Sequence, residues 1–390
     1  MSTVRAALVA VFAAALVFLW PDPAGRGEAA AATDAQVALG KAIFFDASLS
    51  EPAGTSCASC HDPARAFSGD HGSGVGVAAG SRPGSLARRS TPSLLYLAYV
   101  PHFRFFREDD DRGGDAEPYG GFFWDGRADS IAALVRQPLL NPREMNNRDA
   151  GQIAAKLRRA PYADAFRREL PGALDDADRA LDSLGVALQA FLTSPAMAPF
   201  SSKYDDYVRG NATLTAKEEE GLRLFKDRKR VGCSKCHTSF ESSSSPQRSM
   251  FTDYGYEIVG VPRNGKLRTR DADLGLCERT DTVSPSNDAK WCASFRTPSL
   301  RNVAVRKAFM HNGAFTSLRD VVKFYATRAS NPERWYPSGE LFDDTPPAYR
   351  RRVNVSVVPY NRRRGDAPAL DDSEIDAIVA FLGTLTDRRP

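Results

Sequence analysis

Two short frames decide how this sequence is interpreted: Cys57-Ala-Ser-Cys60-His61 and Cys233-Ser-Lys-Cys236-His237. Both have the pattern Cys-x-x-Cys-His, the attachment signature of c-type haem. The two thiols add across the two vinyl groups of one porphyrin, and the adjoining histidine then lies under the iron as proximal ligand. With six cysteines and five histidines in 390 residues, one such frame arises by chance with a probability on the order of 10⁻³ and two with about 10⁻⁶. The sequence therefore predicts two covalently bound c-type haems.

Two other interpretations of the cysteine pairs are weaker. A thioredoxin-like redox motif would leave the following histidine unexplained in both frames. A zinc site that pools both pairs would need segments 176 positions apart (57 to 233) to converge on one metal ion.

The remaining two cysteines, Cys277 and Cys292, stand fifteen positions apart in a stretch rich in Gly, Ser and Asp. In an exported protein this spacing favours a disulfide that closes the loop, which stabilises the fold by about 3 kcal/mol. A second metal site and a reactive thiol are the alternatives for this pair.

The N-terminal residues 1–32 have the features of an export signal. Arg5 supplies the positive charge, the apolar run Ala6–Trp20 follows, and Ala29–Ala32 offers small residues for cleavage. The run is shorter than the ~20 residues that span a bilayer, so a removed signal is favoured over a membrane anchor. We therefore expect a periplasmic protein with no stable membrane insertion, in a compartment where disulfides persist.

The overall composition is that of a globular protein. Hydrophobic residues make up 42% and charged residues 26% of the chain, which excludes a disordered or fibrous protein. The 52 basic and 48 acidic residues leave a net charge of only +4. No basic stripe interleaved with aromatic residues is present, so nucleic acid is not an expected partner.

Segments on either side of the two frames also repeat. Thr33 or Asp34 can cap a helix ahead of the first frame, and Thr215 with Glu218 forms a capping box ahead of the second. Amphipathic patterns over 181–192 and 375–382 predict a closing helix for each half. We expect a mainly α fold of two packed cytochrome c-like haem domains, at 33–207 and 208–390, with the boundary in the polar stretch 204–211.

Longer stretches match a known family. They are Leu39-Gly-Lys-Ala-Ile-Phe-Phe-Asp46, Ser56 to Pro63, Phe123-Trp-Asp-Gly-Arg-Ala128, Asn141-Pro-Arg-Glu-Met145, Phe295-Arg-Thr-Pro-Ser-Leu-Arg-Asn302, Met310-His-Asn-Gly313 and Val321-Val-Lys-Phe-Tyr325. The sequence resembles the bacterial di-haem cytochrome c peroxidases, including their MauG-like branch, over about residues 35 to 385. The resemblance implies that the first haem reacts with peroxide and that the second relays oxidising equivalents.

The resemblance also implies roles for single residues. Glu144 matches the glutamate that moves a proton between the peroxide oxygens, an assistance worth ~10²–10⁴-fold. Trp124 matches the tryptophan that bridges the two haems. Tyr325 stands where the MauG-like branch has the sixth ligand of the second haem, and an oxygen ligand favours oxidised iron. Met310 is the rival ligand. Packing in the core is the ordinary alternative for Trp124 and Tyr325, and a salt bridge near Arg143 is the alternative for Glu144.

Four positions depart from the family pattern. No histidine stands in the loop after Gly76, where some relatives close the first iron, and His71 lies too early to take that role. Leu134 replaces the distal glutamine, and Val231 replaces the surface tryptophan through which MauG oxidises its protein substrate. Ser90 replaces an asparagine associated with a calcium ion between the domains, whose other ligands include backbone carbonyls.

The leading functional hypothesis is a peroxidase that reduces hydrogen peroxide to water. Its electrons come from a small c-type cytochrome or a copper protein of the cupredoxin type. One alternative, within the family, is peroxide-dependent oxidation of side chains on a partner protein, as in MauG. A second alternative, from a different class, is a di-haem electron carrier without turnover; such a carrier would need a sixth ligand on both irons, and none is evident for the first.

Overall fold

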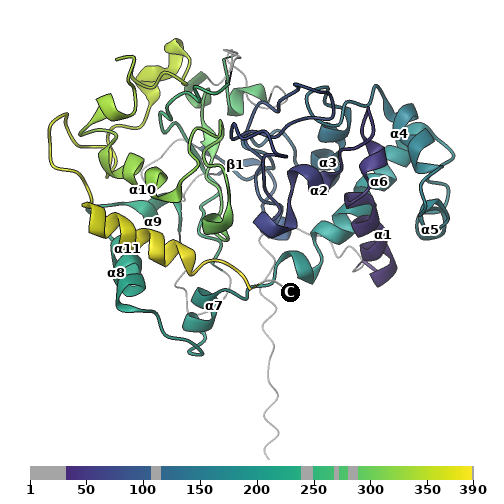
Figure 1. Ribbon diagram of the computed structural model, residues 1–390, viewed down its shortest axis with the longest axis horizontal. Helices are drawn as coiled ribbons and strands as arrows, with labels where there is room; N and C mark the ends of the chain where they lie inside the picture. The colour runs from purple at the N-terminus through teal and green to yellow at the C-terminus, as the bar shows by residue number, and fades with distance from the viewer. Residues whose placement is uncertain (1–31, 107–115, 239–248, 268–271, 280–288, 389–390) are drawn as a thin grey trace, which may run out of the picture. The chain divides into compact units, whose positions relative to one another are not determined.

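Helices supply most of the regular structure in the computed structural model, which describes residues 32–106, 116–238, 249–267, 272–279 and 289–388 (Figure 1). The helices are α1 (Asp34–Phe44), α2 (Cys57–Cys60), α3 (Ile131–Leu140), α4 (Ala150–Leu157), α5 (Ala163–Glu169), α6 (Ala177–Leu192), α7 (Lys203–Val208), α8 (Ala216–Lys226), α9 (Cys233–Cys236), α10 (Leu318–Thr327) and α11 (Asp372–Gly383). The predicted mainly α class is confirmed.

Strands are few and short. β1 (Arg104–Phe106) pairs antiparallel with β2 (Glu117–Tyr119), and β3 (Tyr256–Glu257) pairs antiparallel with β4 (Phe295–Arg296). Residues 1–31, nearly the whole of the predicted export signal, lie outside the described residues. In the part of the chain that is described, no helix combines the length and apolar character needed to cross a bilayer.

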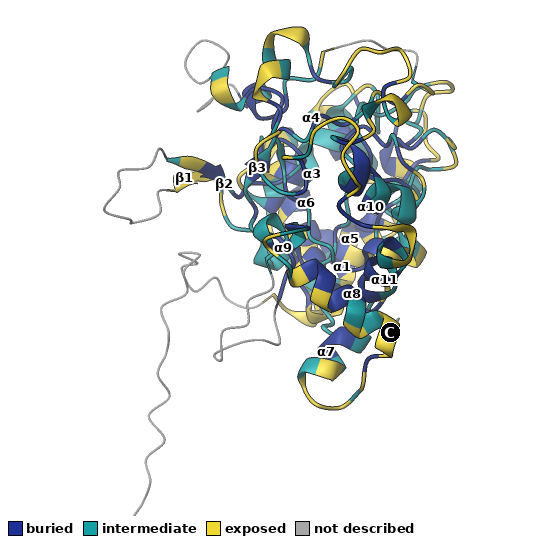
Figure 2. Ribbon diagram, turned by 90° about the vertical axis from the view of Figure 1, so that its left-hand side faces the viewer, coloured by how far each residue is buried: buried dark blue, intermediate teal, exposed yellow. Residues whose placement is uncertain are grey.

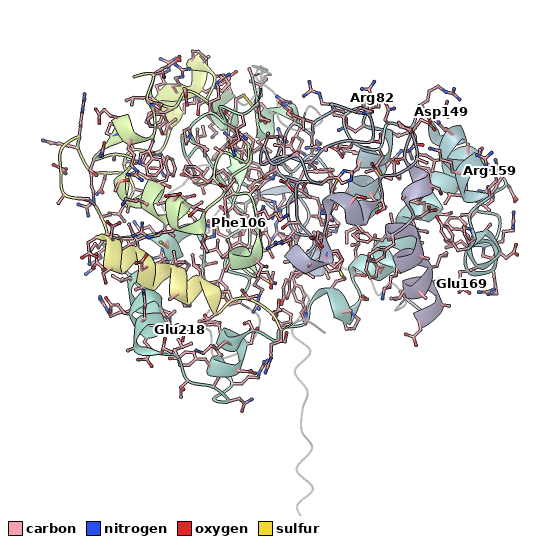
Figure 3. The ribbon with its side chains drawn as sticks, in the orientation of Figure 1. Arg82, Phe106, Asp149, Arg159, Glu169 and Glu218 are labelled. Atoms are coloured by element: carbon pink, nitrogen blue, oxygen red, sulfur yellow. A yellow bond between two sulfur atoms is a disulfide. The ribbon has the colours of Figure 1, made fainter. Side chains whose placement is uncertain are left out.

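The helices that precede the two frames begin at side-chain caps. Thr33, rather than Asp34, caps α1: its hydroxyl accepts from the Gln36 N–H at 3.2 Å. At α8 the Glu218 carboxylate (labelled in Figure 3) accepts from the Thr215 N–H at 2.7 Å, and the Thr215 hydroxyl accepts from the Glu218 N–H. The predicted capping box of the second half is therefore present.

Each half is built around one crossing of two helices. α1 crosses α6 in the first half, and α8 crosses α11 in the second (Figure 1). A Cβ atom on Gly40 would collide with the carbonyl of Ala187, and one on Gly221 would collide with the carbonyl of Ala377. Both glycines begin the same short pattern, Gly-x-x-(Ile/Leu)-Phe, at 40–44 and at 221–225. Each glycine allows the backbones of the two helices to touch.

Two hydrophobic cores surround these crossings, and Figure 2 shows buried residues along the inner faces of α8 and α11. In each core three phenylalanine rings meet with centroids 5.2–6.4 Å apart: Phe44, Phe67 and Phe191 in the first, and Phe225, Phe251 and Phe381 in the second. Tyr204 of α7, placed by sequence in a polar boundary stretch, is buried in the second core against Phe251 and Phe381.

Cys277 and Cys292 form a disulfide. Both residues are buried and pack with Tyr256 and Leu276 in a small separate cluster. The disulfide fixes the segment that carries Asp273 and Glu278, two acids that pair with Arg89.

Candidate active site

The first Cys-x-x-Cys-His frame is a single helical turn with a fixed histidine. Ser56 caps α2 by accepting from the Ser59 N–H, and the His61 N–H closes the turn on the Cys57 carbonyl at 2.8 Å. The His61 Nδ1–H donates to the carbonyl of Phe67 at 2.9 Å, which leaves Nε2 as the nitrogen available to a metal. Burial lowers the pKa of His61 to about 4, so the imidazole is neutral, the form that binds iron.

The second frame repeats this geometry. The His237 N–H donates to the Cys233 carbonyl at 2.9 Å, and the His237 Nδ1–H donates to the carbonyl of Phe251 at 3.0 Å. Burial lowers the pKa of His237 as well. Cys57 packs against the first core and Cys233 against the second, so the two cysteine pairs do not converge on one zinc ion.

A second internal repeat supports both histidines, and sequence reasoning missed it. The segments Thr91-Pro-Ser-Leu94 and Thr297-Pro-Ser-Leu300 are identical in sequence. The Ser93 hydroxyl donates to the carbonyl of Ala66 at 2.6 Å, and the Ser299 hydroxyl donates to that of Met250 at 2.7 Å. Each acceptor directly precedes the phenylalanine whose carbonyl holds the histidine, so each serine fixes the loop that orients its imidazole. The repeated tetrapeptide was the available signal.

The second frame opens onto a largely apolar cavity. Its wall includes Cys233, Cys236, His237, Val259, Leu300 and Tyr325. Burial raises the pKa of both thiols to about 12. An apolar cavity with two thiols and an imidazole on its wall fits a c-type haem, because the porphyrin is apolar and is attached through these groups.

Tyr325 lies on the wall of this cavity, on α10. Burial raises the pKa of the Tyr325 phenol, the nearby Cys236 and Cys233 raise it further, and a hydrogen bond from Tyr360 opposes the rise. The two tyrosine rings lie 5.9 Å apart. Met310 also borders the cavity, so both predicted ligands are present and the choice between them stays a prediction.

Glu144 belongs to the turn that follows α3. The Asn141 amide donates to Glu144 Oε1 at 2.8 Å, and the Glu144 carbonyl accepts from the Ser81 N–H at 2.7 Å. Burial raises the pKa of Glu144, while Arg127 and the Asn141 hydrogen bond oppose the rise. The Glu144 charge in turn helps to raise the pKa of Cys60. The sequence-predicted acid is thus next to the first frame, on a turn that fixes its orientation.

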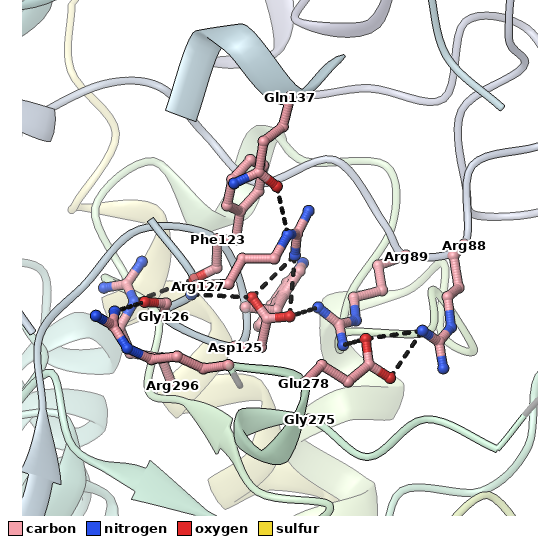
Figure 4. Close-up of polar contacts among 12 residues, drawn as sticks. Arg88, Arg89, Phe123, Asp125, Gly126, Arg127, Gln137, Gly275, Glu278 and Arg296 are labelled. Carbon is pink, nitrogen blue, oxygen red and sulfur yellow. Dashed lines mark hydrogen bonds and ion pairs between the residues drawn. The ribbon is translucent and has the colours of Figure 1, made fainter. Parts of the chain in front are cut away.

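A buried ionic network surrounds the loop that carries Trp124 (Figure 4). Asp125, with no exposed surface, is 2.5 Å from Arg89 and 2.9 Å from Arg127. Arg89 also pairs with Asp273 at 2.7 Å, which joins the first half to the disulfide-bearing segment of the second. Nothing in the local sequence pattern of Asp125 identified these partners.

Trp124 lies between this network and the cavity beside the second Cys-x-x-Cys-His frame. The ring is 7% exposed and borders the cavity. Its indole N–H donates to the Ser90 carbonyl at 2.8 Å, and the Ser90 hydroxyl donates to the Met310 carbonyl at 2.6 Å. Trp124 is therefore held by residues of the first half that are themselves bonded to the second half.

The loop after the first frame is fastened by backbone contacts. His71 Nδ1 is hydrogen-bonded to the Ala79 carbonyl at 2.9 Å. Gly76 lies against Gly313, and a Cβ atom on either residue would collide with the carbonyl of the other. The Asn264 amide donates to Val75 and to Asn312, which ties the same loop to the second half.

Two other departures from the family pattern lie in the cores. Leu134 is buried in the first core, and Val231 is buried in the second, 2% exposed. One turn beyond Leu134 on α3, the Gln137 side-chain oxygen accepts from Arg127 Nε at 2.7 Å (Figure 4). Arg127 and Gln137 were not predicted as site residues.

Comparisons with known proteins agree with these features. The family model for di-haem cytochrome c peroxidase matches residues 34–213. The methylamine utilization protein MauG of Paracoccus denitrificans is 37% identical, over 96% of this chain and 95% of that protein. The cytochrome c551 peroxidase of Pseudomonas aeruginosa is 25% identical, over 92% of this chain and 80% of that protein.

A solved structure is similar along most of the chain. The diheme peroxidase BthA of Burkholderia thailandensis matches with a TM-score of 0.85 and 46% identity, over 92% of this chain and 87% of that one. The family model covers the first half with its Cys-x-x-Cys-His frame, whereas the Paracoccus protein and the Burkholderia structure match over nearly the whole chain. The chain therefore belongs to the di-haem cytochrome c peroxidase and MauG family, a family of oxidoreductases that implies two c-type haems.

Proposed function

We propose that this protein is a periplasmic peroxidase that reduces hydrogen peroxide to water in a first haem domain (33–207) and takes up electrons through a second (208–390). Two electrons and two protons convert each peroxide into two water molecules. The donor is a small c-type cytochrome or a cupredoxin. The observation that carries the proposal is an asymmetry: the two histidine frames share one geometry, but Glu144 stands beside the first, whereas Tyr325 borders the cavity of the second.

The cofactors would be held by residues already in place. Cys57 and Cys60 would attach the first haem with His61 as proximal ligand, and Cys233, Cys236 and His237 would do the same for the second. When bound, the first haem supplies an iron that reacts with peroxide, and the second supplies an iron that stores and passes an electron. The hydrogen bonds from His61 to Phe67 and from His237 to Phe251 would keep each Nε2 directed at its iron.

Glu144 would move the proton. Its ionised carboxylate would accept a proton from one peroxide oxygen and return it to the other as the bond between them breaks, assistance worth ~10²–10⁴-fold. The Asn141 amide orients the carboxylate. Burial raises the Glu144 pKa above the ordinary value of a glutamate, and Arg127 and the Asn141 hydrogen bond oppose the rise.

Tyr325 and Trp124 would serve the transfer of electrons through the second haem. The Tyr325 phenol would offer its oxygen to the second haem, and an oxygen ligand favours oxidised iron over reduced iron. The Trp124 ring, on the wall of the second cavity and hydrogen-bonded to Ser90, would carry the electron between the haems.

The calcium ion implied by the family resemblance stays a prediction. At Ser90 the carbonyl accepts from Trp124 and the hydroxyl donates to the Met310 carbonyl. The described residues contain no cluster of three His, Cys, Asp or Glu side chains suited to a metal, so the ion would depend on backbone carbonyls, which calcium also accepts as ligands. MauG-like oxidation of a partner protein is the second candidate, favoured by the 37% identity to the Paracoccus protein; the burial of Val231 argues against the docking tryptophan at that position.

The test combines composition with turnover. Mass spectrometry of the denatured mature protein should show two added haems. The holoprotein should then oxidise a reduced small cytochrome c when peroxide is supplied, with two cytochromes oxidised per peroxide. A single haem, or two haems with no oxidation of any cytochrome or cupredoxin donor, would contradict the proposal. Side-chain oxidation of a partner without donor turnover would favour the second candidate.

A further inference from the structure

Arg306 has unused hydrogen-bonding capacity on the wall of the second cavity. It directly follows the short 3₁₀ turn Val303–Val305. Its Nε atom is buried without a hydrogen-bond partner, and Nη2 makes one long contact, 3.4 Å, to the carbonyl of Thr91. A guanidinium has five N–H donors, so most of its donor capacity remains unsatisfied within the described residues.

The charge of Arg306 is also uncompensated. No carboxylate in the described part of the chain pairs with it, whereas the buried Arg301 pairs with Asp205 at 2.8 Å. Burial lowers the pKa of Arg306 only to about 10, so the side chain is a cation at neutral pH. Arg306 as a whole is partly exposed, but its Nε is buried. A cation held in such a place without a counter-charge is unfavourable unless an anion pairs with it.

Another arginine on this wall differs in this respect. Arg296 donates to the Phe123 carbonyl at 3.3 Å, and its charge faces Tyr256, Tyr254 and Asp125. Among the described residues no carboxylate or phenol is bonded to Arg306, and burial lowers its pKa. The missing partner of Arg306 is therefore an anion that enters the cavity from outside the chain.

We propose that Arg306 binds a carboxylate carried by the cofactor attached at Cys233 and Cys236. This inference rests on the proposed function, in which that cofactor is a c-type haem. A porphyrin of this type carries two propionate groups, and the planar guanidinium fork binds a carboxylate through two parallel hydrogen bonds. Because the pair lies in a cavity of low polarity, the positive charge also stabilises the reduced form of the second haem.

The contact of Arg306 with Thr91 raises the question of which haem is involved. Thr91 belongs to the first copy of the Thr-Pro-Ser-Leu repeat, which supports His61, so a carboxylate of the first haem is the competing partner. The cavity wall on which Arg306 lies instead contains Cys233, Cys236 and His237. We assign the contact to the second haem, and the experiment separates the two haems.

The experiment compares three variants of the holoprotein: Arg306→Met, Arg306→Lys and, as control, Lys307→Met, which removes the same charge from the exposed neighbouring residue. Mass spectrometry first establishes two haems in the wild type; a failure there would reject the proposed function. Spectroelectrochemistry then gives the midpoint potential of each haem, and resonance Raman spectra report the propionate bending band.

Arg306→Met should disfavour reduction of the second haem at least tenfold, a 59 mV decrease for one electron, and should shift its propionate band. Arg306→Lys should keep most of the potential, and Lys307→Met should change neither reading. Unchanged second-haem readings in a two-haem Arg306→Met protein, or a shift confined to the first haem, would overturn the inference. If Arg306→Met fails to retain the second haem, the Arg306→Lys variant is used instead. A propionate band in Arg306→Lys that matches the wild type would overturn the inference.

Discussion

The indole N–H of Trp124 donates to the carbonyl oxygen of Ser90 at 2.8 Å. Ser90 is bonded in turn to the second half of the chain, through its hydroxyl to Met310 and through its N–H to the His311 carbonyl at 2.7 Å. This relationship places the aromatic ring at the junction of the two halves. A residue that passes electrons between two sites needs such a fixed position.

We predict that Trp124→Phe slows oxidation of the second haem but not the reaction of peroxide at the first haem. Phenylalanine keeps much of the packing but loses the N–H donor and is harder to oxidise. Peroxide should still react at the first haem at nearly the wild-type rate, while oxidation of the second haem slows at least tenfold. Stopped-flow absorbance resolves the two haems. Trp335→Phe, which removes an indole bonded to Thr327 elsewhere in the second half, is the control, and equal rates in both variants would dismiss the bridging role.

Glu144 gives a pH dependence with a defined sign. In the proposed function Glu144 accepts the first proton and must be ionised to do so, so kcat/KM should fall as the pH drops through its pKa. Because burial raises that pKa, the acid limb should lie above the ordinary 4.5 of a glutamate. Glu144→Gln should remove the limb and lower the rate by about 10²-fold or more. A Glu144→Gln profile that keeps the wild-type limb would assign it to another group.

Arg127 provides a second test of the same carboxylate. Its positive charge lowers the pKa of Glu144, so Arg127→Met should move the acid limb to higher pH. Arg159→Met, which removes an exposed arginine from the far end of the first half (Figure 3), should leave the limb in place. The limb is measured as kcat/KM for peroxide from pH 4 to 8, and movement to lower pH in Arg127→Met would contradict the assignment.

Tyr325→Met should raise the midpoint potential of the second haem, because a thioether ligand stabilises reduced iron relative to an oxygen ligand. Tyr207→Phe, at an exposed tyrosine, is the control for loss of a phenol. Spectroelectrochemistry measures both. If the potential and spectrum of Tyr325→Met match those of the wild type while Met310→Leu changes them, Met310 is the ligand.

The close crossing of α8 and α11 predicts that alanine is destabilising at one glycine of this helix pair and harmless at another. Alanine at Gly221 would force its Cβ into the Ala377 carbonyl, whereas a Cβ atom on Gly383, at the end of α11, would meet no other atom within 4 Å. Gly221→Ala should lower the free energy of unfolding by about 1–3 kcal/mol, the usual cost of overpacking. Urea unfolding followed by circular dichroism should show Gly383→Ala unchanged or slightly more stable; equal losses would contradict the close crossing.

Much of the fold was predictable because its determinants are local. The capping box at Thr215 and the Cys277–Cys292 pair are each specified by residues close together in sequence. Glu144 and Tyr325 were found through a family resemblance, since a glutamate in a turn or a tyrosine on an apolar helix has no unique meaning alone.

The buried charges could not be predicted in this way. Arg89 and Asp273 are 184 positions apart, and their pairing depends on how the two halves pack. In the sequence nothing distinguishes Arg127 from other basic residues, and its contacts with Asp125 and Gln137 arise only in the fold. Arg306 differs from exposed arginines only through its burial, which has no signature in the neighbouring sequence.

The most direct test of the central claim is to mix hydrogen peroxide with the oxidised holoprotein, without any reductant, and follow its absorbance and electron paramagnetic resonance. We predict a high-spin ferric signal from the haem at His61 that disappears on mixing, because His71 is held by the Ala79 carbonyl and the loop around Gly76 is fastened to Gly313. Two low-spin signals, with no reaction until one electron is added, would contradict the account and show that a protein ligand closes the first iron.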